Sequence, residues 1–145
     1  MNENELSIKH ELIKLVSLYD ETTSEEKKLV LYNKIAELAN NNLDNDYLDN
    51  YYCSCSIEEF CTQLSIEIIQ PNNHNKTEIL NFIHTIFQHR NNIDSFDYYI
   101  EKFSLAIEYF YKKPQGTLRE YIYHDDIDTI DAIINKLNED TTIYL

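Results

Sequence analysis

Residues 95–113, SFDYYIEKFSLAIEYFYKK, form the stretch that decides the fold class. Apolar side chains recur there every three or four residues, which is the period of one face of an α-helix. Ser95 is the expected N-cap, because its hydroxyl can accept a hydrogen bond from a free backbone N–H group. Lys112 and Lys113 are expected in the last turn, before Pro114 and Gly116 end the helix. The apolar face consists of Phe96, Tyr99, Ile100, Phe103, Ala106, Ile107 and Phe110.

The same spacing predicts further helices along the rest of the chain. One spans residues 5–19, and a second begins at a capping box formed by Thr23 and Glu26. A third begins at a box of Ser56 and Glu59, and a fourth spans residues 76–88. Asp128 or Thr129 is expected to cap the last helix, which carries Ile130, Ile133, Ile134 and Leu137.

Three segments have less regular patterns. Residues 43–52 indicate a loop or a short helical turn, whereas residues 65–69 could form a strand because their isoleucines are β-branched. Residues 118–123 alternate well enough for a short strand or an extended segment. Only one glycine and two prolines occur among the 145 residues, which disfavours sheets with many tight turns. We therefore expect a mainly α protein, a single domain over residues 1–145 with five or six helices, and leave a short C-terminal hairpin open.

Charge and cysteine content exclude several classes of function. The 26 acidic residues outnumber the 12 lysines and arginines, giving a net charge of −14, which disfavours direct binding to nucleic acid or anionic membranes. No apolar run reaches the length of a signal peptide or a membrane span. Cys53, Cys55 and Cys61 are odd in number and clustered, so we expect buried or half-buried free thiols and a cytoplasmic location.

Catalytic and metal-binding motifs are not found in the sequence. His84 and His89 are five residues apart, a spacing that does not place two ligands on one helix face, and His84 is expected at the edge of a core. The aspartates lack the spacing and the central glycine of a calcium-binding EF-hand loop. We therefore expect no cofactor, no metal and no enzyme activity. One alternative remains, because Arg119 and His124 resemble the R-x4-6-H motif of the HEPN ribonucleases, which implies action on RNA phosphates.

Two acidic windows contain many tyrosines. Between Lys34 and Lys76 there are seven acids and no lysine or arginine, and a second window lies near residues 120–131. Acids attract the basic side chains of a partner protein, and tyrosines supply rigid contact area at low entropic cost. The predicted partner-binding residues are Asp44, Asp46, Tyr47, Asp49, Tyr51, Tyr52, and secondarily Tyr123, Asp125 and Asp126.

Residues 110–124, FYKKPQGTLREYIYH, followed by a helix beginning near Thr129, resemble the C-terminal segment of bacterial immunity proteins. These proteins belong to the contact-dependent growth inhibition and related polymorphic toxin systems. In them a small residue and a serine or threonine precede an acidic–aliphatic–isoleucine–aromatic run and a short last helix. The resemblance implies an antitoxin that binds a cognate toxin domain, often a nuclease, and blocks its active site. An acidic nucleic-acid mimic or adaptor is a further alternative that the composition leaves open.

Overall fold

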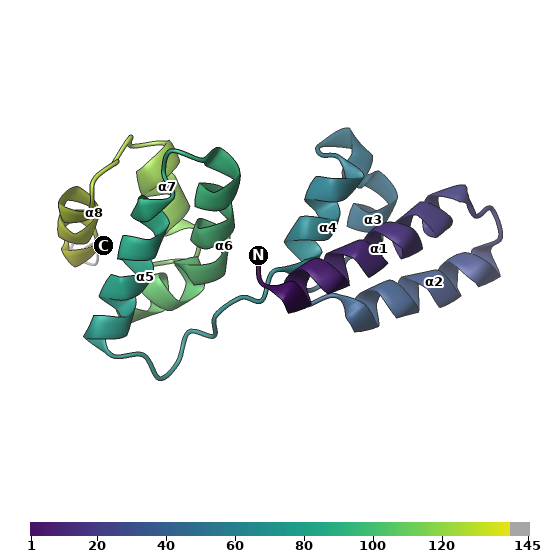
Figure 1. Cartoon of the computed structure of the whole chain (residues 1–145), viewed down its shortest axis with the longest axis horizontal. Coiled ribbons are helices and arrows are strands. Elements are labelled where there is room, and N and C mark those ends of the chain that lie inside the picture. The colour runs from purple at the N-terminus through teal and green to yellow at the C-terminus, as the bar shows by residue number, and fades with distance from the viewer. Residues whose placement is uncertain (140–145) are drawn as a thin grey trace, which may run out of the picture. The chain divides into compact units, whose positions relative to one another are not determined.

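The computed structural model describes residues 1–139, and these residues form an all-α protein (Figure 1). The described part contains eight α-helices, one 3₁₀-helix and no strand, which confirms the mainly α prediction. The number of helices exceeds the expected five or six because short helices form in two segments whose sequence patterns indicate irregular or extended structure. The chain divides into an N-terminal unit, residues 1–67, and a C-terminal unit, residues 68–145. The assignment of both to one domain stays a prediction.

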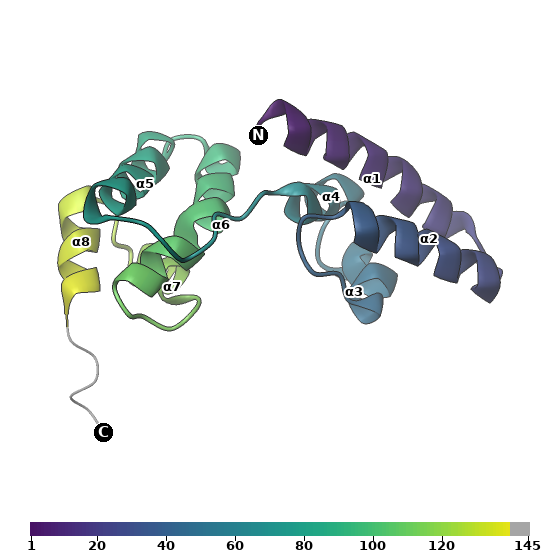
Figure 2. The ribbon, with the colours of Figure 1, turned by 90° about the horizontal axis from the view of Figure 1, so that it is seen from below.

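The N-terminal unit is built around the pair of helices α1 (Glu3–Glu21) and α2 (Glu25–Leu38), which lie side by side (Figures 1 and 2). Helix α4 (Ile57–Ser65) packs on α1. The short α3 (Asn45–Asn50) and the 3₁₀-helix η1 (Tyr51–Cys53) connect α2 to α4. The core of this unit consists of Leu12, Val16, Tyr19, Ile35, Leu48, Tyr51, Phe60, Cys61 and Leu64.

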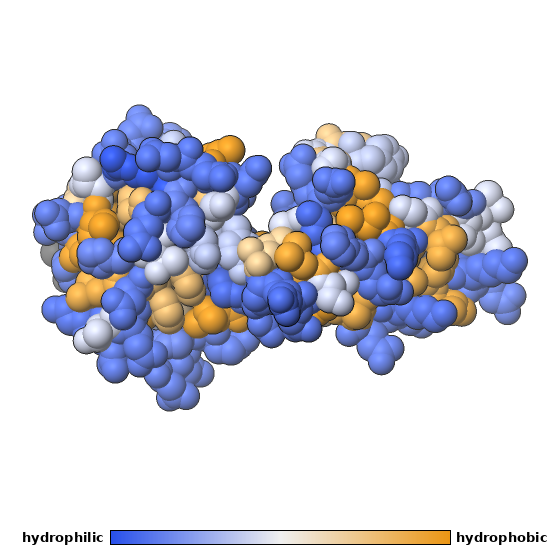
Figure 3. Space-filling view, in the orientation of Figure 1, coloured by the Kyte–Doolittle hydropathy of each residue, from blue (hydrophilic) through white to orange (hydrophobic). Residues whose placement is uncertain are grey.

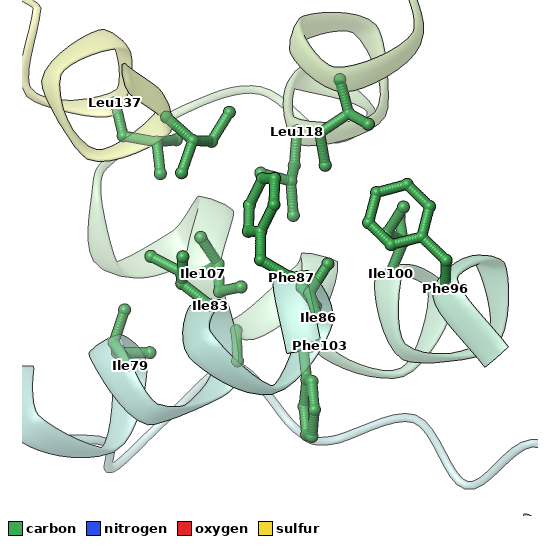
Figure 4. Packing of buried hydrophobic residues seen from close by; sticks show 13 residues of the cluster. Ile79, Ile83, Ile86, Phe87, Phe96, Ile100, Phe103, Ile107, Leu118 and Leu137 are labelled. Atoms are coloured by element: carbon green, nitrogen blue, oxygen red, sulfur yellow. The ribbon is translucent and has the colours of Figure 1, made fainter. Parts of the chain in front are cut away.

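The C-terminal unit consists of α5 (Lys76–Gln88), α6 (Ile93–Phe110), α7 (Thr117–Tyr123) and α8 (Ile130–Asn138). Figure 4 shows isoleucine and phenylalanine side chains of α5 and α6 meeting Leu118 of α7 and Leu137 of α8. The apolar face predicted for α6 supplies much of this core. The buried residues are Ile79, Ile83, Ile86, Phe87, Phe96, Ile100, Phe103, Ala106, Ile107, Leu118, Ile122, Ile133 and Leu137.

Two helices begin at a different cap from the one expected. Ser24, not Thr23, caps α2, and its hydroxyl accepts a hydrogen bond from the backbone N–H of Lys27. Asn92, not Ser95, caps α6, and its side-chain oxygen accepts from the N–H of Ser95 at 3.3 Å. Both sites offer two good cap residues close together, so the sequence pattern does not choose between them.

The C-terminal strand prediction is wrong, because residues 117–123 form α7. Leu118 and Ile122 lie four residues apart and are both buried, as helical periodicity requires. Gly116, the N-cap of α7, has no side chain, and the buried carboxylate of Glu108 accepts the N–H of Leu118 at 2.8 Å instead. The segment at residues 65–69 is not a strand either, since α4 continues to Ser65 and irregular backbone follows.

Each unit contains a buried glutamate that bonds to backbone N–H groups. Glu5 is fully buried and accepts from the N–H groups of Asn2 at 3.0 Å and Glu67 at 2.7 Å. Glu108, 2% exposed, has the same role in the C-terminal unit. Burial raises the pKa of Glu108, although its hydrogen bonds from the backbone of α7 oppose that rise. Such carboxylates join segments that are distant in sequence.

On the face shown in Figure 3, hydrophilic residues surround several smaller apolar patches. Among the described helices, none combines the length and the apolar character needed to cross a membrane.

Candidate partner-binding surface

The aspartates and tyrosines of the first acidic window, residues 44–52, lie at α3 and η1, and most of them are exposed to solvent. Asp44, Asp46 and Asp49 are exposed, and no ion pair joins them to a lysine or arginine among residues 1–139. Tyr47 is 38% exposed and Tyr52 is 68% exposed. We call these five residues the acidic tyrosine surface.

Local hydrogen bonds explain why this window is helical. The carboxylate of Asp44 accepts from the N–H of Asp46 at 2.8 Å and so caps α3. The hydroxyl of Tyr32 donates to the carbonyl of Leu43 at 3.0 Å, which ties the preceding loop to α2. Leu48 is fully buried and anchors α3 to the core. The short helix α3 therefore has a side-chain cap, a buried leucine in the core and a preceding loop that is hydrogen-bonded to α2.

Phe60 of α4 supports the surface from below. Tyr51 stacks on the Phe60 ring with centroids 4.5 Å apart, and Tyr47 meets the same ring edge-on at 5.1 Å. Tyr51 is only 4% exposed, so it belongs to the core and holds the surface from inside. Tyr47 also donates from its hydroxyl to Gln63 at 2.8 Å. The exposed tyrosines thus pack against buried aromatic rings. This packing limits the side-chain entropy that is lost when a partner binds.

Two tyrosine hydroxyls orient two aspartates at this end of the unit. Tyr19 of α1 donates to Asp49, and Tyr51 donates to Asp20, each at 2.5 Å. Burial, followed by the hydrogen bond to Asp49, raises the pKa of Tyr19 to about 12, and the pKa of Tyr51 rises for the same reasons with Asp20. A neutral hydroxyl orients a carboxylate without cancelling its charge. Asp20 therefore joins the candidate site.

Sequence reasoning missed Asp20, which lies in the last turn of α1. The signal that could have found it is weak, since Asp20 only follows a tyrosine at the end of an apolar stripe. Its position beside Tyr51, 31 residues away in sequence, comes from the packing of α1 against the α3–α4 region.

The second acidic window lies on and after α7, in the C-terminal unit. Tyr123 is 42% exposed, and Asp125 and Asp126 are exposed. The hydroxyl of Tyr123 donates to Asp97 of α6 at 3.1 Å. Asp126 adopts a left-handed backbone conformation with φ 55°, as aspartate tolerates in turns. Tyr123 is the last residue of α7, and Asp125 and Asp126 follow it in the turn after the helix.

Arg119 of α7 forms ion pairs with two acids of α6. Its guanidinium donates to Asp97 at 2.8 Å and to Glu101 at 2.7 Å, and it also lies over the ring of Tyr123. A phosphate would have to displace one of these carboxylates to reach Arg119. His124, the other residue of the ribonuclease-like pair, is exposed at the C-cap of α7. This arrangement does not favour the ribonuclease alternative.

The remaining histidines and the cysteines depart in part from expectation. His84 is exposed, so its predicted place at a core edge is wrong; the polar side of α5 carries it. His89 is half-buried with its ring 4.5 Å from that of Tyr99. Cys55 and Cys61 are half-buried and buried free thiols as expected, but Cys53 is exposed. Burial raises the pKa of Cys61 to about 12, which keeps that thiol protonated and inert.

Among residues 1–139, no group of three or more histidine, cysteine or acidic side chains is arranged to hold a metal ion. No protein-family model matches the chain, and neither curated proteins nor solved structures gave a match to it.

Proposed function

We propose that this protein is an immunity protein that binds a cognate toxin domain, of the basic nuclease type, and blocks its active site. The observation that carries the proposal is the acidic tyrosine surface, in which three exposed aspartates without an ion pair among residues 1–139 lie close in sequence to two exposed tyrosines. The C-terminal resemblance to immunity proteins supports the same function independently of the surface.

The chemistry of this surface suits a basic partner. Uncompensated carboxylates accelerate the encounter with lysines and arginines and pair with them at the interface. Tyr47 and Tyr52 supply the buried contact area that holds a complex together after the encounter. Nuclease active sites are basic because they bind phosphates, so an acidic surface can occupy one in place of the substrate.

The second acidic window has a secondary role in the proposal. Tyr123, Asp125 and Asp126 would extend the contact, but Arg119 already cancels charge on the neighbouring Asp97 and Glu101. We therefore expect the acidic tyrosine surface to contribute more to affinity than the second window.

The first experiment is a pull-down of the tagged full-length protein from its native host, at low and at high salt. We expect one basic protein domain that binds less tightly as the salt concentration rises. Recovery of RNA without a protein partner would contradict the proposal and favour the ribonuclease alternative.

The second experiment maps the surface with a charge-matched pair of variants. Combined Asp44→Asn, Asp46→Asn and Asp49→Asn substitutions should weaken partner binding by roughly tenfold or more and reduce its salt dependence. The control replaces three exposed glutamates of α2, Glu25, Glu26 and Glu37, with glutamine, which removes the same charge elsewhere on the unit. Equal effects of both variants would show that net charge, and not this surface, governs binding.

A further inference from the structure

A pocket of about 460 Å³ lies in the C-terminal unit, where the segment before α5 passes the C-terminal end of α6. Pockets of several hundred Å³ are large enough for small molecules. Its lining residues are Pro71, Asn73, His74, Tyr109, Phe110, Lys112 and Lys113. Within the described part of the chain, three cationic or protonatable side chains line it and no carboxylate does.

The positive lining stands out against the composition of the protein. Acids outnumber lysines and arginines by 26 to 12 over the chain, yet two lysines meet at this one pocket. Lys113 is 9% exposed, and its ammonium group donates to the backbone carbonyl of Glu139, a neutral partner. Lys112 is exposed to solvent. A carbonyl carries no negative charge to balance a buried ammonium group, which favours an anion nearby.

The end of α6 is completed by backbone groups of Lys112 and Lys113, so the side chain of Lys112 is not used for capping. The N–H of Lys112 bonds to the carbonyl of Tyr109 at 3.2 Å, and the N–H of Lys113 bonds to that of Glu108 at 2.9 Å. This pattern is a Schellman motif, in which backbone groups satisfy the last carbonyls. The helix ends at Phe110, so the prediction that the lysines lie in its last turn is wrong.

Lys112 occupies the position of this motif that glycine fills most readily. Its φ is 58°, in the left-handed region that disfavours residues with a Cβ atom. Asn73, in the segment before α5, also lines the pocket and has a positive φ of 70°. Strained residues of this kind gather at ligand-binding sites. Lys112 occupies a position where glycine would cost less, and Lys112 lines the pocket.

His74 also lines this pocket, and hydrogen bonds within the protein hold both of its ring nitrogens. Its Nε2 lies 2.7 Å from the carbonyl oxygen of Gln70, and its Nδ1 lies 3.2 Å from a carboxylate oxygen of Glu78. Because both ring nitrogens face acceptors, the imidazolium form fits this geometry best. These two hydrogen bonds, that to Gln70 first, raise the pKa of His74. Glu78 offsets the charge of His74, so Lys112 and Lys113 supply the net positive charge of the pocket.

From these contacts we propose that the pocket binds a small molecule that carries an aromatic ring and a carboxylate or phosphate group. Lys112 and Lys113 would hold the anionic group, and Tyr109, Phe110 and Pro71 would surround the ring. The site lies entirely in the C-terminal unit and does not depend on the immunity function proposed above.

The test is a titration of the isotope-labelled full-length protein, followed by NMR, with four probes. Phenyl phosphate and phenylacetate carry both a ring and an anion, benzyl alcohol carries only the ring, and inorganic phosphate carries only the anion. We expect the two anionic ring compounds to shift resonances of the pocket residues, with affinities about tenfold higher than those of the other two probes. A preference for phenyl phosphate or phenylacetate identifies the anionic group that the natural ligand carries.

Variants at Lys112 separate ligand binding from folding. Lys112→Gln should weaken binding of the preferred probe by about tenfold, whereas Lys76→Gln, an exposed lysine outside the pocket, should change it by less than about twofold. Lys112→Gly should weaken binding equally and yet raise the Tm, because glycine fits the left-handed conformation. The proposal is overturned if no probe shifts the pocket residues, if benzyl alcohol binds as tightly as the anionic compounds, or if Lys76→Gln weakens binding as much as Lys112→Gln.

Discussion

The two units are both acidic, but the fold gives their acids different partners. In the N-terminal unit, tyrosine hydroxyls donate to Asp20 and Asp49. In the C-terminal unit, Arg119 pairs with both Asp97 and Glu101. The first arrangement orients carboxylates and leaves their charge intact, whereas the second cancels it.

The net charges of the two units follow the same division. The N-terminal unit has five lysines against fourteen acids, a net charge of −9. The C-terminal unit has seven lysines and arginines against twelve acids, a net charge of −5. Counting acids therefore overstates the negative charge that a partner meets wherever a basic side chain pairs with them. A neutral hydroxyl donor leaves the charge of the carboxylate uncompensated.

The largest expected effects come from the two separate cores. Phe60→Ala removes the ring that Tyr47 and Tyr51 contact and should lower the free energy of unfolding by about 3–5 kcal/mol. Ile83→Ala should lower it by about 2–5 kcal/mol. Because each residue belongs to one core only, we expect each variant to lower hydrogen-exchange protection in its own unit. Loss of protection throughout the chain in either variant would instead indicate one cooperative domain.

The next largest effect concerns the buried carboxylate of the C-terminal unit. Glu108→Ala leaves the N–H of Leu118 without its acceptor and should cost about 1–3 kcal/mol in urea unfolding. Glu108→Gln keeps an acceptor of the same shape and should cost less. Equal losses in the two variants would show that the charge, and not the hydrogen bond, stabilises the start of α7.

Glu108 should also make stability depend on pH. Because burial raises its pKa in the folded protein, the folded state holds this proton more tightly than the unfolded state. Its contribution is present below the ordinary glutamate pKa and is lost as pH rises through the raised pKa. The stability of the parent minus that of Glu108→Gln should therefore fall with rising pH over that interval. A difference that grows with pH would contradict the raised pKa.

A smaller effect is expected from the tyrosine–aspartate bonds of the N-terminal unit. Tyr51→Phe removes the hydroxyl that donates to Asp20 and should cost about 1–2 kcal/mol, whereas Tyr52→Phe, at an exposed ring, should stay within about 0.5 kcal/mol. Urea unfolding measures both. Similar losses in the two variants would remove the distinction between supporting and exposed tyrosines.

The ionisation of Tyr19 at high pH tests these tyrosine–aspartate hydrogen bonds in a second way. Its pKa of about 12 lies above the ordinary tyrosine value, so its contribution to stability is complete below pH ~10 and is lost as pH rises through about 12. Spectroscopic titration should show Tyr19 among the tyrosines that ionise above the ordinary value, together with Tyr51 and Tyr123. In Tyr19→Phe, one fewer tyrosine should ionise in that late group.

The smallest effect is expected at the ion pairs between Arg119 and the acids of α6. Asp97→Asn leaves Glu101 in contact with Arg119, and ion pairs that are this exposed contribute about 0–1 kcal/mol. The loss should shrink further as salt is added. A loss of several kcal/mol would mean that Arg119 stabilises the C-terminal unit, in which case the comparison between the windows would concern folding as well as charge.

Helix positions were largely predictable from the sequence, because the apolar period and the cap residues are local. The boundaries expected for α5 agree with the structure, and Ser56 and Thr129 cap α4 and α8 as expected. The error at α7 arose because a six-residue pattern fits both a strand and a helix. The contact that selects the helix comes from Glu108, which lies on another element.

The candidate site was predicted in part. Exposure of Asp44, Asp46, Asp49, Tyr47 and Tyr52 agrees with a surface role, whereas Tyr51 lies in the core. Tyrosines next to one another in sequence, such as 51 and 52, differ in burial because the 3₁₀-helix points one inward and the other outward. Composition alone cannot predict which of two adjacent tyrosines is buried.

The sequence by itself determined the helical class, most helix positions, the acidic character and the location of both windows, since periodicity, capping and charge are local or additive properties. Only the tertiary structure decided which acids keep their charge, that Asp20 lies beside Tyr51, and that two lysines and a histidine line one pocket. The physical reason is that hydrogen bonds and ion pairs act over a few ångströms, and packing, not distance along the chain, determines which groups come that close.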